Sequence, residues 1–332
     1  MAVAVSGDGK LIASGDWNGE LIARDGNTGE CLTRAIKAHS QGISLLDFSP
    51  DNAALATVSG DNTIKLWRTD TWQIHGNPIN VGEQIDCVRY SPSGHLLAIE
   101  TLKFIQIWNP SGQKCITKLR AYCSSLAWTP DGTRLLSGGN YVDPMVREWD
   151  TSTWKQVGDP WSGHTDTIRA LAVNSTGTLL ASASHDNHIR LWRISDRRTV
   201  AEFNHPYAVY GVTFSVDGQY ILCGSADTNI TEWSVPGDVL LEDRLNAQTS
   251  LSVSFSLFAV SLFPSDLAEG KFANGSCKGA RDERCKFLTV SVSDPSDPSL
   301  MFMRRLQTIA TRQIFTLCSR MRSDQVPYRF YP

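Results

Sequence analysis

A histidine, a serine and an aspartate occur in the set that a hydrolase could use, as His164, Ser182 and Asp186. In a catalytic triad the histidine takes the proton of the serine hydroxyl, and the aspartate orients the imidazole. The same types of residue recur at the same separations earlier in the chain, as His39, Thr57 and Asp61. A catalytic triad does not come in multiple copies around one fold, so we predict that both sets are structural.

The elements that position these residues form an internal repeat. Each unit carries a short apolar segment that ends in an anchor position, at residues 24, 67, 108, 149, 192 and 233, with gaps of 43, 41, 41, 43 and 41 residues. Five anchors are tryptophans, and the weaker first unit has Arg24 instead. A turn aspartate precedes four of the anchors by six residues, as Asp61, Asp143, Asp186 and Asp227.

Each unit is expected to fold as four short strands. Turn signals such as Thr129-Pro-Asp-Gly separate the apolar runs, and no segment with helical periodicity is long enough to intervene. A sheet of four short strands cannot bury both of its faces alone. Stacking successive sheets in a ring buries those faces and leaves only short edges. The fold class predicted is therefore all-β, with six recognisable blades of a β-propeller.

The repeat resembles the WD40 family in its period and blade pattern over residues 2–244, although the Trp-Asp dipeptide itself occurs only at Trp149-Asp150. In that family a His, a Ser or Thr, the turn Asp and the anchor Trp form a buried hydrogen-bonded tetrad. The resemblance implies two complete tetrads. Trp192 completes the set of His164, Ser182 and Asp186, and Trp67 completes the set of His39, Thr57 and Asp61. A third has His205, Asp227 and Trp233 but places Cys223 where the hydroxyl belongs.

Other chemistry finds little support. The repeated aspartates could be read as a ring of metal ligands, but the tetrad directs each carboxylate toward its own blade, so we expect no metal site, no cofactor and no catalytic residues. The eight cysteines form no C-x-x-C pair, and we expect at least the first five to be free and buried. A formal net charge of −3 argues against a nucleic-acid-binding chain. The uncharged stretch 245–265 alternates as a strand does, which argues against a membrane span.

The resemblance implies a non-catalytic, intracellular scaffold that binds a protein or peptide through one loop face of the propeller. Family contacts fall just before the turn aspartate and near the start of the strand that follows the histidine. Carried onto this chain, the first place includes Thr101 and Val142. The residues expected to contact a partner are Trp17, Asp86, Tyr122, Arg169, His185 and Tyr210.

The ends of the chain depart from the pattern. We expect residues 1–244 to form the propeller, with 238–241 as the outer strand of its sixth blade. Residues 250–256 then open a seventh unit in register, because Phe255 follows Phe214 by 41 residues. No anchor tryptophan follows, so 245–332 is a degenerate seventh blade, a helical or disordered tail, or sequence foreign to the propeller. The alternative function is the ligand-sensing region of a larger NTPase-type signalling protein of the kind found in fungi, present here as a fragment. An enzyme built on a propeller is the third reading.

Overall fold

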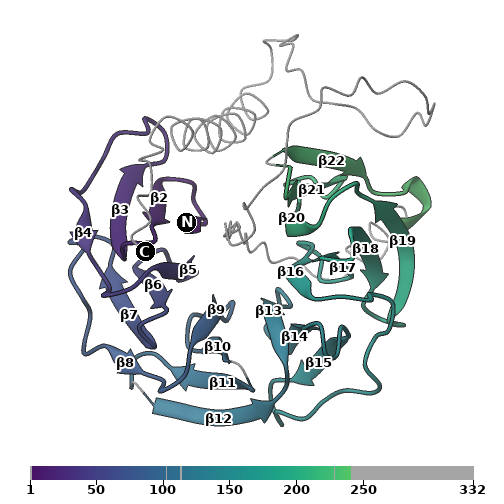
Figure 1. The fold of residues 1–332 in the computed structure, drawn as a ribbon, viewed down its shortest axis with the longest axis horizontal. Coiled ribbons are helices and arrows are strands. Elements are labelled where there is room, and N and C mark those ends of the chain that lie inside the picture. The colour runs from purple at the N-terminus through teal and green to yellow at the C-terminus, as the bar shows by residue number, and fades with distance from the viewer. Residues whose placement is uncertain (1, 102, 113, 228, 241–332) are drawn as a thin grey trace, which may run out of the picture.

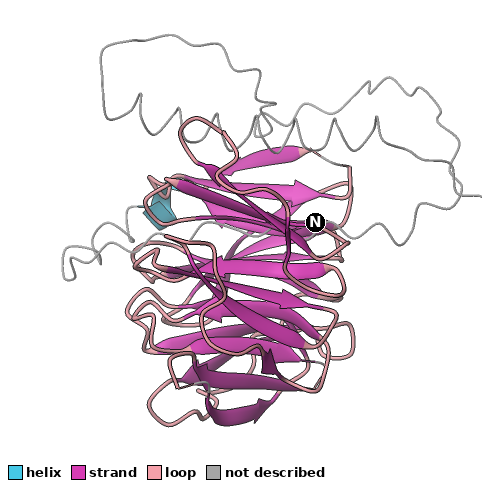
Figure 2. Ribbon diagram, turned by 90° about the vertical axis from the view of Figure 1, so that its left-hand side faces the viewer, coloured by secondary structure: helices cyan, strands magenta, loops and turns pink. Residues whose placement is uncertain are grey.

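The computed structural model describes residues 2–101, 103–112, 114–227 and 229–240 of the 332-residue chain. The strands form six antiparallel sheets, and in each sheet the strands pair in chain order. Figure 1 shows the six sheets arranged as blades around a central axis, with the first strand of each blade innermost. Figure 2 shows the same blades edge-on, with the connecting loops gathered at the two ends of the strands. The all-β propeller with six blades is confirmed.

The first three blades have four strands each. Blade 1 comprises β1 (Ala2–Val5), β2 (Leu11–Gly15), β3 (Glu20–Asp25) and β4 (Ile36–Lys37). Blade 2 comprises β5 (Ile43–Phe48), β6 (Ala54–Ser59), β7 (Thr63–Arg68) and β8 (Ile79–Asn80). Blade 3 comprises β9 (Ile85–Tyr90), β10 (Leu97–Thr101), β11 (Phe104–Asn109) and β12 (Lys114–Arg120).

Blade 5 also has four strands, whereas blades 4 and 6 have three. Blade 4 comprises β13 (Cys123–Trp128), β14 (Arg134–Gly139) and β15 (Val146–Asp150), flanked by single bridges to Trp161 and Gln156. Blade 5 comprises β16 (Ile168–Val173), β17 (Leu179–Ser184), β18 (His188–Arg193) and β19 (Arg198–Asn204). Blade 6 comprises β20 (Val209–Phe214), β21 (Tyr220–Ser225) and β22 (Ile230–Ser234). All six anchor positions lie in the third strand of their blade.

The expected outer strand of blade 6 is wrong as far as the structure describes it. Residues 237–240 form a helical turn, in which Leu240 N–H donates to Pro236 C=O at 3.0 Å. Proline at 236 suits the start of such a turn, because it lacks an N–H to donate. Val235 and Val239 are buried in the cluster shared by blades 5 and 6, so the turn is held by apolar packing instead of by strand pairing.

The short connections at one end of the blades are fixed by local hydrogen bonds. In the turn that follows β13, Thr129 Oγ1 donates to Asp131 Oδ1 at 2.6 Å, and Gly132 N–H donates to Thr129 C=O at 2.8 Å. Gly132 has φ = 70°, a conformation that glycine adopts without steric cost. The Ser/Thr-x-Asp-Gly signals of the sequence therefore mark tight turns between the first and second strands.

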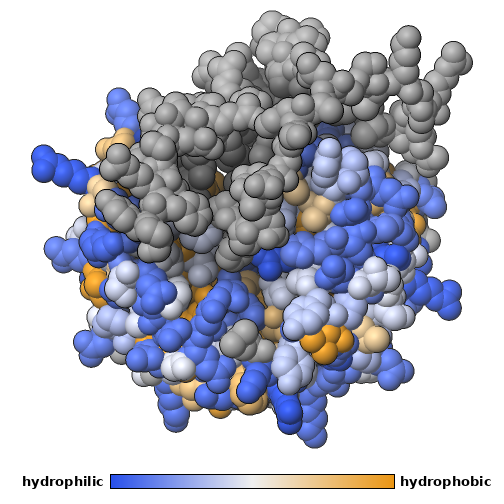
Figure 3. Space-filling model, in the orientation of Figure 1, coloured by the Kyte–Doolittle hydropathy of each residue, from blue (hydrophilic) through white to orange (hydrophobic). Residues whose placement is uncertain are grey.

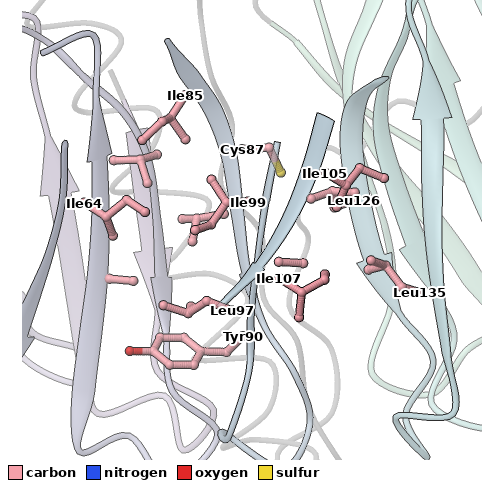
Figure 4. Close-up of a cluster of buried hydrophobic side chains, with 14 of the residues drawn as sticks. Ile64, Ile85, Cys87, Tyr90, Leu97, Ile99, Ile105, Ile107, Leu126 and Leu135 are labelled. Carbon is pink, nitrogen blue, oxygen red and sulfur yellow. The ribbon is translucent and has the colours of Figure 1, made fainter. Parts of the chain in front are cut away.

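The core lies between blades. One cluster joins blades 2, 3 and 4, where Ile64, Ile99, Ile105 and Leu126 are almost completely buried. Figure 4 shows these side chains projecting from neighbouring sheets toward one another. Each apolar side chain of this size contributes about 1.5–3 kcal/mol when removed from water. Successive side chains of a strand point to opposite faces of its sheet, and in these blades both faces are apolar. The ring arrangement buries each face against an adjacent blade.

The innermost strands pack in chain order, from β1 through β5, β9, β13 and β16 to β20. Among the described strands, β20 and β1 are not a packed pair of this kind. No described helix has the length and apolar character needed to cross a membrane. The first five cysteines are free thiols, but the prediction that all are buried is wrong, because Cys31 is exposed and Cys115 is half-buried. The sequence predictions for 245–332 lie outside the described residues.

Candidate functional site

The histidine, serine and aspartate of blade 5 meet in a single hydrogen-bonded chain. His164 Nδ1 lies 2.8 Å from Asp186 Oδ2, and His164 Nε2 lies 2.7 Å from Ser182 Oγ. Trp192 Nε1–H donates to the same Ser182 Oγ at 2.8 Å. Asp186 also accepts the backbone N–H of Thr165 at 2.9 Å. The chain of bonds links the entry loop of the blade to its second and third strands.

Blade 2 repeats this arrangement. Trp67 Nε1–H donates to Thr57 Oγ1 at 3.0 Å, and Thr57 Oγ1 lies 2.8 Å from His39 Nε2. His39 Nδ1 is 3.1 Å from Asp61 Oδ2. Burial lowers the pKa of His39, and it does so despite the neighbouring Asp61 charge. A neutral ring that donates from Nδ1 and accepts at Nε2 leaves every group in the chain satisfied.

Electrostatics support the same assignment at the aspartates. Burial works to raise the pKa of Asp61, but the hydroxyl of Thr63, the backbone N–H of Ser40 and His39 together hold it at about 2. The pKa of Asp186 is likewise held well below its usual range, with His164 as the main partner that outweighs burial. Both carboxylates are ionised at neutral pH and act as acceptors.

The set in blade 6, in which Cys223 stands at the hydroxyl place, does not form the hydrogen-bonded chain seen in blades 2 and 5. His205 Nδ1 accepts the backbone N–H of Tyr207 at 3.2 Å, within its own loop. Cys223 Sγ lies 2.7 Å from Thr231 Oγ1. Trp233 Nε1–H acts on the pKa of the Cys223 thiol, yet it makes no hydrogen bond of normal geometry to any described residue. A thiol is a weak acceptor, so it does not organise the histidine and the tryptophan as a hydroxyl does.

The tetrads are not arranged for catalysis. Ser182 has no exposed surface, and its Oγ already accepts the Trp192 N–H. A nucleophile must be reachable by a substrate carbonyl, and this oxygen is enclosed between strands. Within the described ranges, no cluster of three or more His, Cys, Asp or Glu side chains has the arrangement of a metal site.

The remaining candidate residues gather at one end of the propeller, which we call the top face. It carries the loops between the second and third strands of each blade and the segments that enter the innermost strands. Antiparallel meanders place both kinds of segment at the same end. Trp17 and His185 lie in such loops, and Tyr122 directly precedes β13. The second residues of β9, β16 and β20 at this end are Asp86, Arg169 and Tyr210. Figure 3 shows one end view of the propeller as mainly hydrophilic, with separate hydrophobic spots.

Three of these residues come together at the mouth of the channel. His185 follows β17, and its ring meets Tyr210 of β20 edge-on, with centroids 5.2 Å apart. Burial lowers the pKa of His185, and the Arg169 charge lowers it further. The buried Nε2 of His185 has no hydrogen-bond partner among the described residues. Blades 5 and 6 thus present one arginine and two rings beside the channel.

Asp86 lies apart from that group and is paired with its neighbour Gln84, whose Nε2 donates at 2.9 Å. Both Asp86 and Arg169 act on Glu100, a buried side chain of β10 that sequence reasoning missed. Burial raises the pKa of Glu100 well above its usual range, and Asp86 raises it further. Glu100 could not be identified from the sequence, because the third unit lacks the turn aspartate that marks the end of the second strand in other units.

Trp17 and Tyr122 are exposed on separate loops, with 46% and 38% of their surface accessible. The Trp17 ring packs near Gly42, where an added Cβ would lie 3.4 Å from ring atom Cε3. Two further aromatic residues of the top face, Tyr141 and Tyr207, are 75% and 51% exposed. All four large exposed aromatic side chains of the described residues therefore lie at one end of the propeller.

Two family-contact positions were misplaced. Thr101 is buried inside β10 instead of preceding a turn aspartate. The loop between β14 and β15 is longer than its counterpart in blade 5, so Asn140, not Val142, directly follows the second strand as His185 does.

Comparison with known proteins agrees with the geometry. The family model described as "WD domain, G-beta repeat" matches residues 29–68, 113–150, 154–193 and 197–234. Each matched segment ends at the anchor strand of a blade, and two of them contain the hydrogen-bonded tetrads. The chain is a WD40 repeat protein.

Similarity to curated WD40 and related proteins is moderate. The chain is 27% identical over 209 residues to WD repeat-containing protein 1 of Gallus gallus, covering 59% of this chain and 33% of that protein. It is 24% identical over 246 residues to pre-mRNA-processing factor 19 of Oryza sativa subsp. japonica, covering 66% of this chain and 43% of that protein. It is 26% identical over 272 residues to a guanine nucleotide-binding protein subunit beta of Oryza sativa subsp. japonica, covering 74% of this chain and 69% of that protein. The chain thus spans well under two thirds of the first two relatives.

Proposed function

We propose that this WD40 protein is a non-catalytic scaffold that binds a protein or peptide partner on its top face. The observation that carries the proposal is the gathering of the exposed aromatic side chains at that end, as Trp17, Tyr122, Tyr141 and Tyr207. Aromatic residues and arginine supply most of the binding energy at protein interfaces. Rigid blades hold the loops that carry these residues, which lowers the entropy lost on binding.

The channel mouth adds polar specificity to this surface. Arg169, His185 and Tyr210 lie together, while Asp86 provides a negative charge elsewhere at the same end of the propeller. Charges of both signs suit a folded protein or a peptide better than a nucleic-acid backbone, which needs a continuous positive surface. The names of the relatives include a subunit of a guanine nucleotide-binding protein and a pre-mRNA-processing factor. The experiment must therefore distinguish a ribonucleoprotein partner from a protein or peptide partner.

The test is quantitative affinity capture with the full chain as bait. A triple variant, Trp17→Ala with Tyr122→Ala and Tyr141→Ala, is compared with the unchanged protein. Loss of three interface aromatics at about 1 kcal/mol or more each is expected to reduce recovery of the specific partners by at least tenfold. The matched control changes exposed apolar residues away from the top face, namely Leu32, Ile74 and Val216, to alanine.

The control is expected to leave the captured set unchanged. Equal recovery by the wild type and the triple variant, with both folded, would contradict the assignment of the top face. If nuclease treatment releases the captured partners, then binding depends on RNA, and the proposal of a protein or peptide partner is wrong. Direct binding of a purified captured protein to wild type but not to the triple variant would establish the proposal.

A further inference from the structure

The outer strand of blade 3, β12, is hydrogen-bonded to the sheet on one side only. It pairs with β11 and ends the sheet order β12-β11-β10-β9. Among the described outer strands only β12 and β19 have seven residues, whereas β4 and β8 have two each. Figure 1 shows β12 on the perimeter of the propeller. The main-chain N–H and C=O groups on the outer side of such an edge can pair with another chain.

Four side chains of β12 are exposed, at alternate positions of the strand. They are Lys114, Ile116, Lys118 and Arg120, so three of the four carry a positive charge. Ile116 keeps 48% of its surface accessible and lies at a bulge, beyond which β12 pairs regularly with β11. Side chains two residues apart in a strand lie on the same face, which places Lys118 and Arg120 side by side at a separation of about 7 Å.

The equivalent edge in blade 5 is electrically balanced. Arg190 of β18 is paired with Glu202 of β19, and their side chains form an ion pair at 2.9 Å. The same cross-strand pair in blade 3 is Gln106 with Lys118. Gln106 is buried, and its side-chain oxygen accepts Trp108 Nε1–H at 3.1 Å. Blade 3 thus places a lysine where blade 5 has a carboxylate, and an uncharged amide where blade 5 has the arginine.

The surrounding sequence leaves the charge of β12 uncompensated. Between Glu100 and Asp131 the chain has four Lys or Arg residues and no Asp or Glu, in a protein with a formal net charge of −3. Within the described ranges, none of the three cations of β12 forms an ion pair. Like charges on two such edges would repel each other, which argues against a second copy of this chain as the partner.

We propose that β12 binds an extended acidic segment of a partner protein, which adds to blade 3 as a further strand. Opposite residues of adjacent strands have Cβ atoms about 4.5–5.5 Å apart, so carboxylates at alternate positions of the segment meet Lys118 and Arg120. An apolar side chain two residues further along covers Ile116. Main-chain hydrogen bonds supply affinity, and the alternate side chains supply the preference for acidic sequences. The contact is on the rim of the propeller, so it does not depend on partner binding at the top face.

The chemistry of this edge favours a peptide over a nucleic acid. The edge presents main-chain donors and acceptors in the spacing of another strand, which a sugar-phosphate backbone does not match. Sites for single-stranded nucleic acid combine cations with aromatic side chains on which the bases stack. β12 has no aromatic residue, and its exposed apolar side chain is Ile116.

The test is binding of the full chain to a fluorescent synthetic peptide in which glutamate alternates with valine and threonine, followed by anisotropy. Charge reversal in the double variant Lys118→Glu with Arg120→Glu is expected to weaken binding at least tenfold, because two attractive pairs become repulsive. The matched control is Arg34→Glu with Lys155→Glu, which makes the same change in net charge at exposed positions of blades 1 and 4. The control is expected to bind within about twofold of the wild type. A peptide with lysine in place of glutamate should prefer the charge-reversed variant.

A backbone-modified peptide tests the strand addition itself. N-methylation at alternate residues keeps every charge but removes the main-chain donors that would face β12. We expect at least tenfold weaker binding of this peptide. Hydrogen exchange of β12 amides should slow in the presence of the unmodified peptide and stay unchanged with the methylated one.

The opposite results would overturn the proposal. Equal affinities of the charge-reversed and control variants would exclude β12 as the site. Equal affinities of the methylated and unmethylated peptides would contradict strand addition. Folded protein that shows no saturable binding at about 1 mM peptide would also refute it. Tighter binding of a polyuridylate oligonucleotide than of the peptide, lost in the charge-reversed variant, would assign this edge to a nucleic acid.

Discussion

Removing the hydroxyl of Ser182 tests whether the tetrad stabilises the propeller. In Ser182→Ala, two buried groups lose their partner, because His164 Nε2 and Trp192 Nε1 both bond to this oxygen. Neither side chain can turn to water, since the His164 side chain has no exposed surface and Trp192 is 1% exposed. An unsatisfied buried polar group costs about 1–3 kcal/mol, so for these two groups the free energy of unfolding should fall by about 2–6 kcal/mol.

The measurement is urea unfolding at pH 7.5, followed by tryptophan fluorescence and by circular dichroism. The matched control is Ser14→Ala, at the equivalent place in blade 1. That hydroxyl has only a 3.4 Å contact with Ile22 C=O, in a blade that lacks the histidine and the tryptophan. Its loss should change the free energy of unfolding by less than about 0.5 kcal/mol. Equal shifts of the unfolding midpoint in the two variants would refute the role assigned to the tetrad.

Three more predictions follow from buried polar groups. Cys223→Ser should raise the unfolding free energy by about 1 kcal/mol by offering Trp233 Nε1–H an acceptor, and a lower melting temperature than that of the wild type would contradict this. Glu100 has a raised pKa, so its stabilising contribution is present at low pH and lost as pH rises; Glu100→Gln should therefore gain stability relative to wild type between pH 5 and pH 8, and parallel pH profiles would argue against it. Asp61 has a pKa of about 2, so its contribution is present above the unfolded value of about 3.9 and lost as pH falls toward 2. Asp61→Asn should lose less stability than the wild type over that interval, as acid titration of the unfolding midpoint will show.

Much of the fold could be predicted because its signals are periodic and local. The anchor spacing places the third strand of all six blades, and the Ser/Thr-x-Asp-Gly turns mark the end of the first strand. The tetrads of blades 2 and 5 could also be identified, since all four residue types are present at the right separations. In those cases the turn residues, the strand pattern and the tetrad residues all agree with the overall fold.

The remaining features depend on contacts between segments or on small changes in loop length. His205 has the correct spacing, but a thiol at Cys223 cannot hold its ring, and sequence spacing does not report acceptor strength. Val142 was misplaced by extra residues in one loop. The helical turn that replaces the expected strand beyond β22 depends on the burial of Val239 among residues of two blades. Periodicity alone does not encode such three-dimensional contacts.

In the second strand of each blade, the position held by Gly15, Glu100 or Gly138 lies beside the first residue of the next innermost strand. Gly15 leaves room for Ile43 and Gly138 for Ile168, whereas the buried Glu100 occurs in the one blade whose successor begins with a cysteine, Cys123. At the two glycine boundaries, the space beside the second strand is therefore filled by the first side chain of the next blade. Exchanging blade 3 for blade 1 would bring a carboxylate against the isoleucine of blade 2 and a void against Cys123. The six described blades share one backbone pattern, but blades 1 and 3 are not interchangeable at this position.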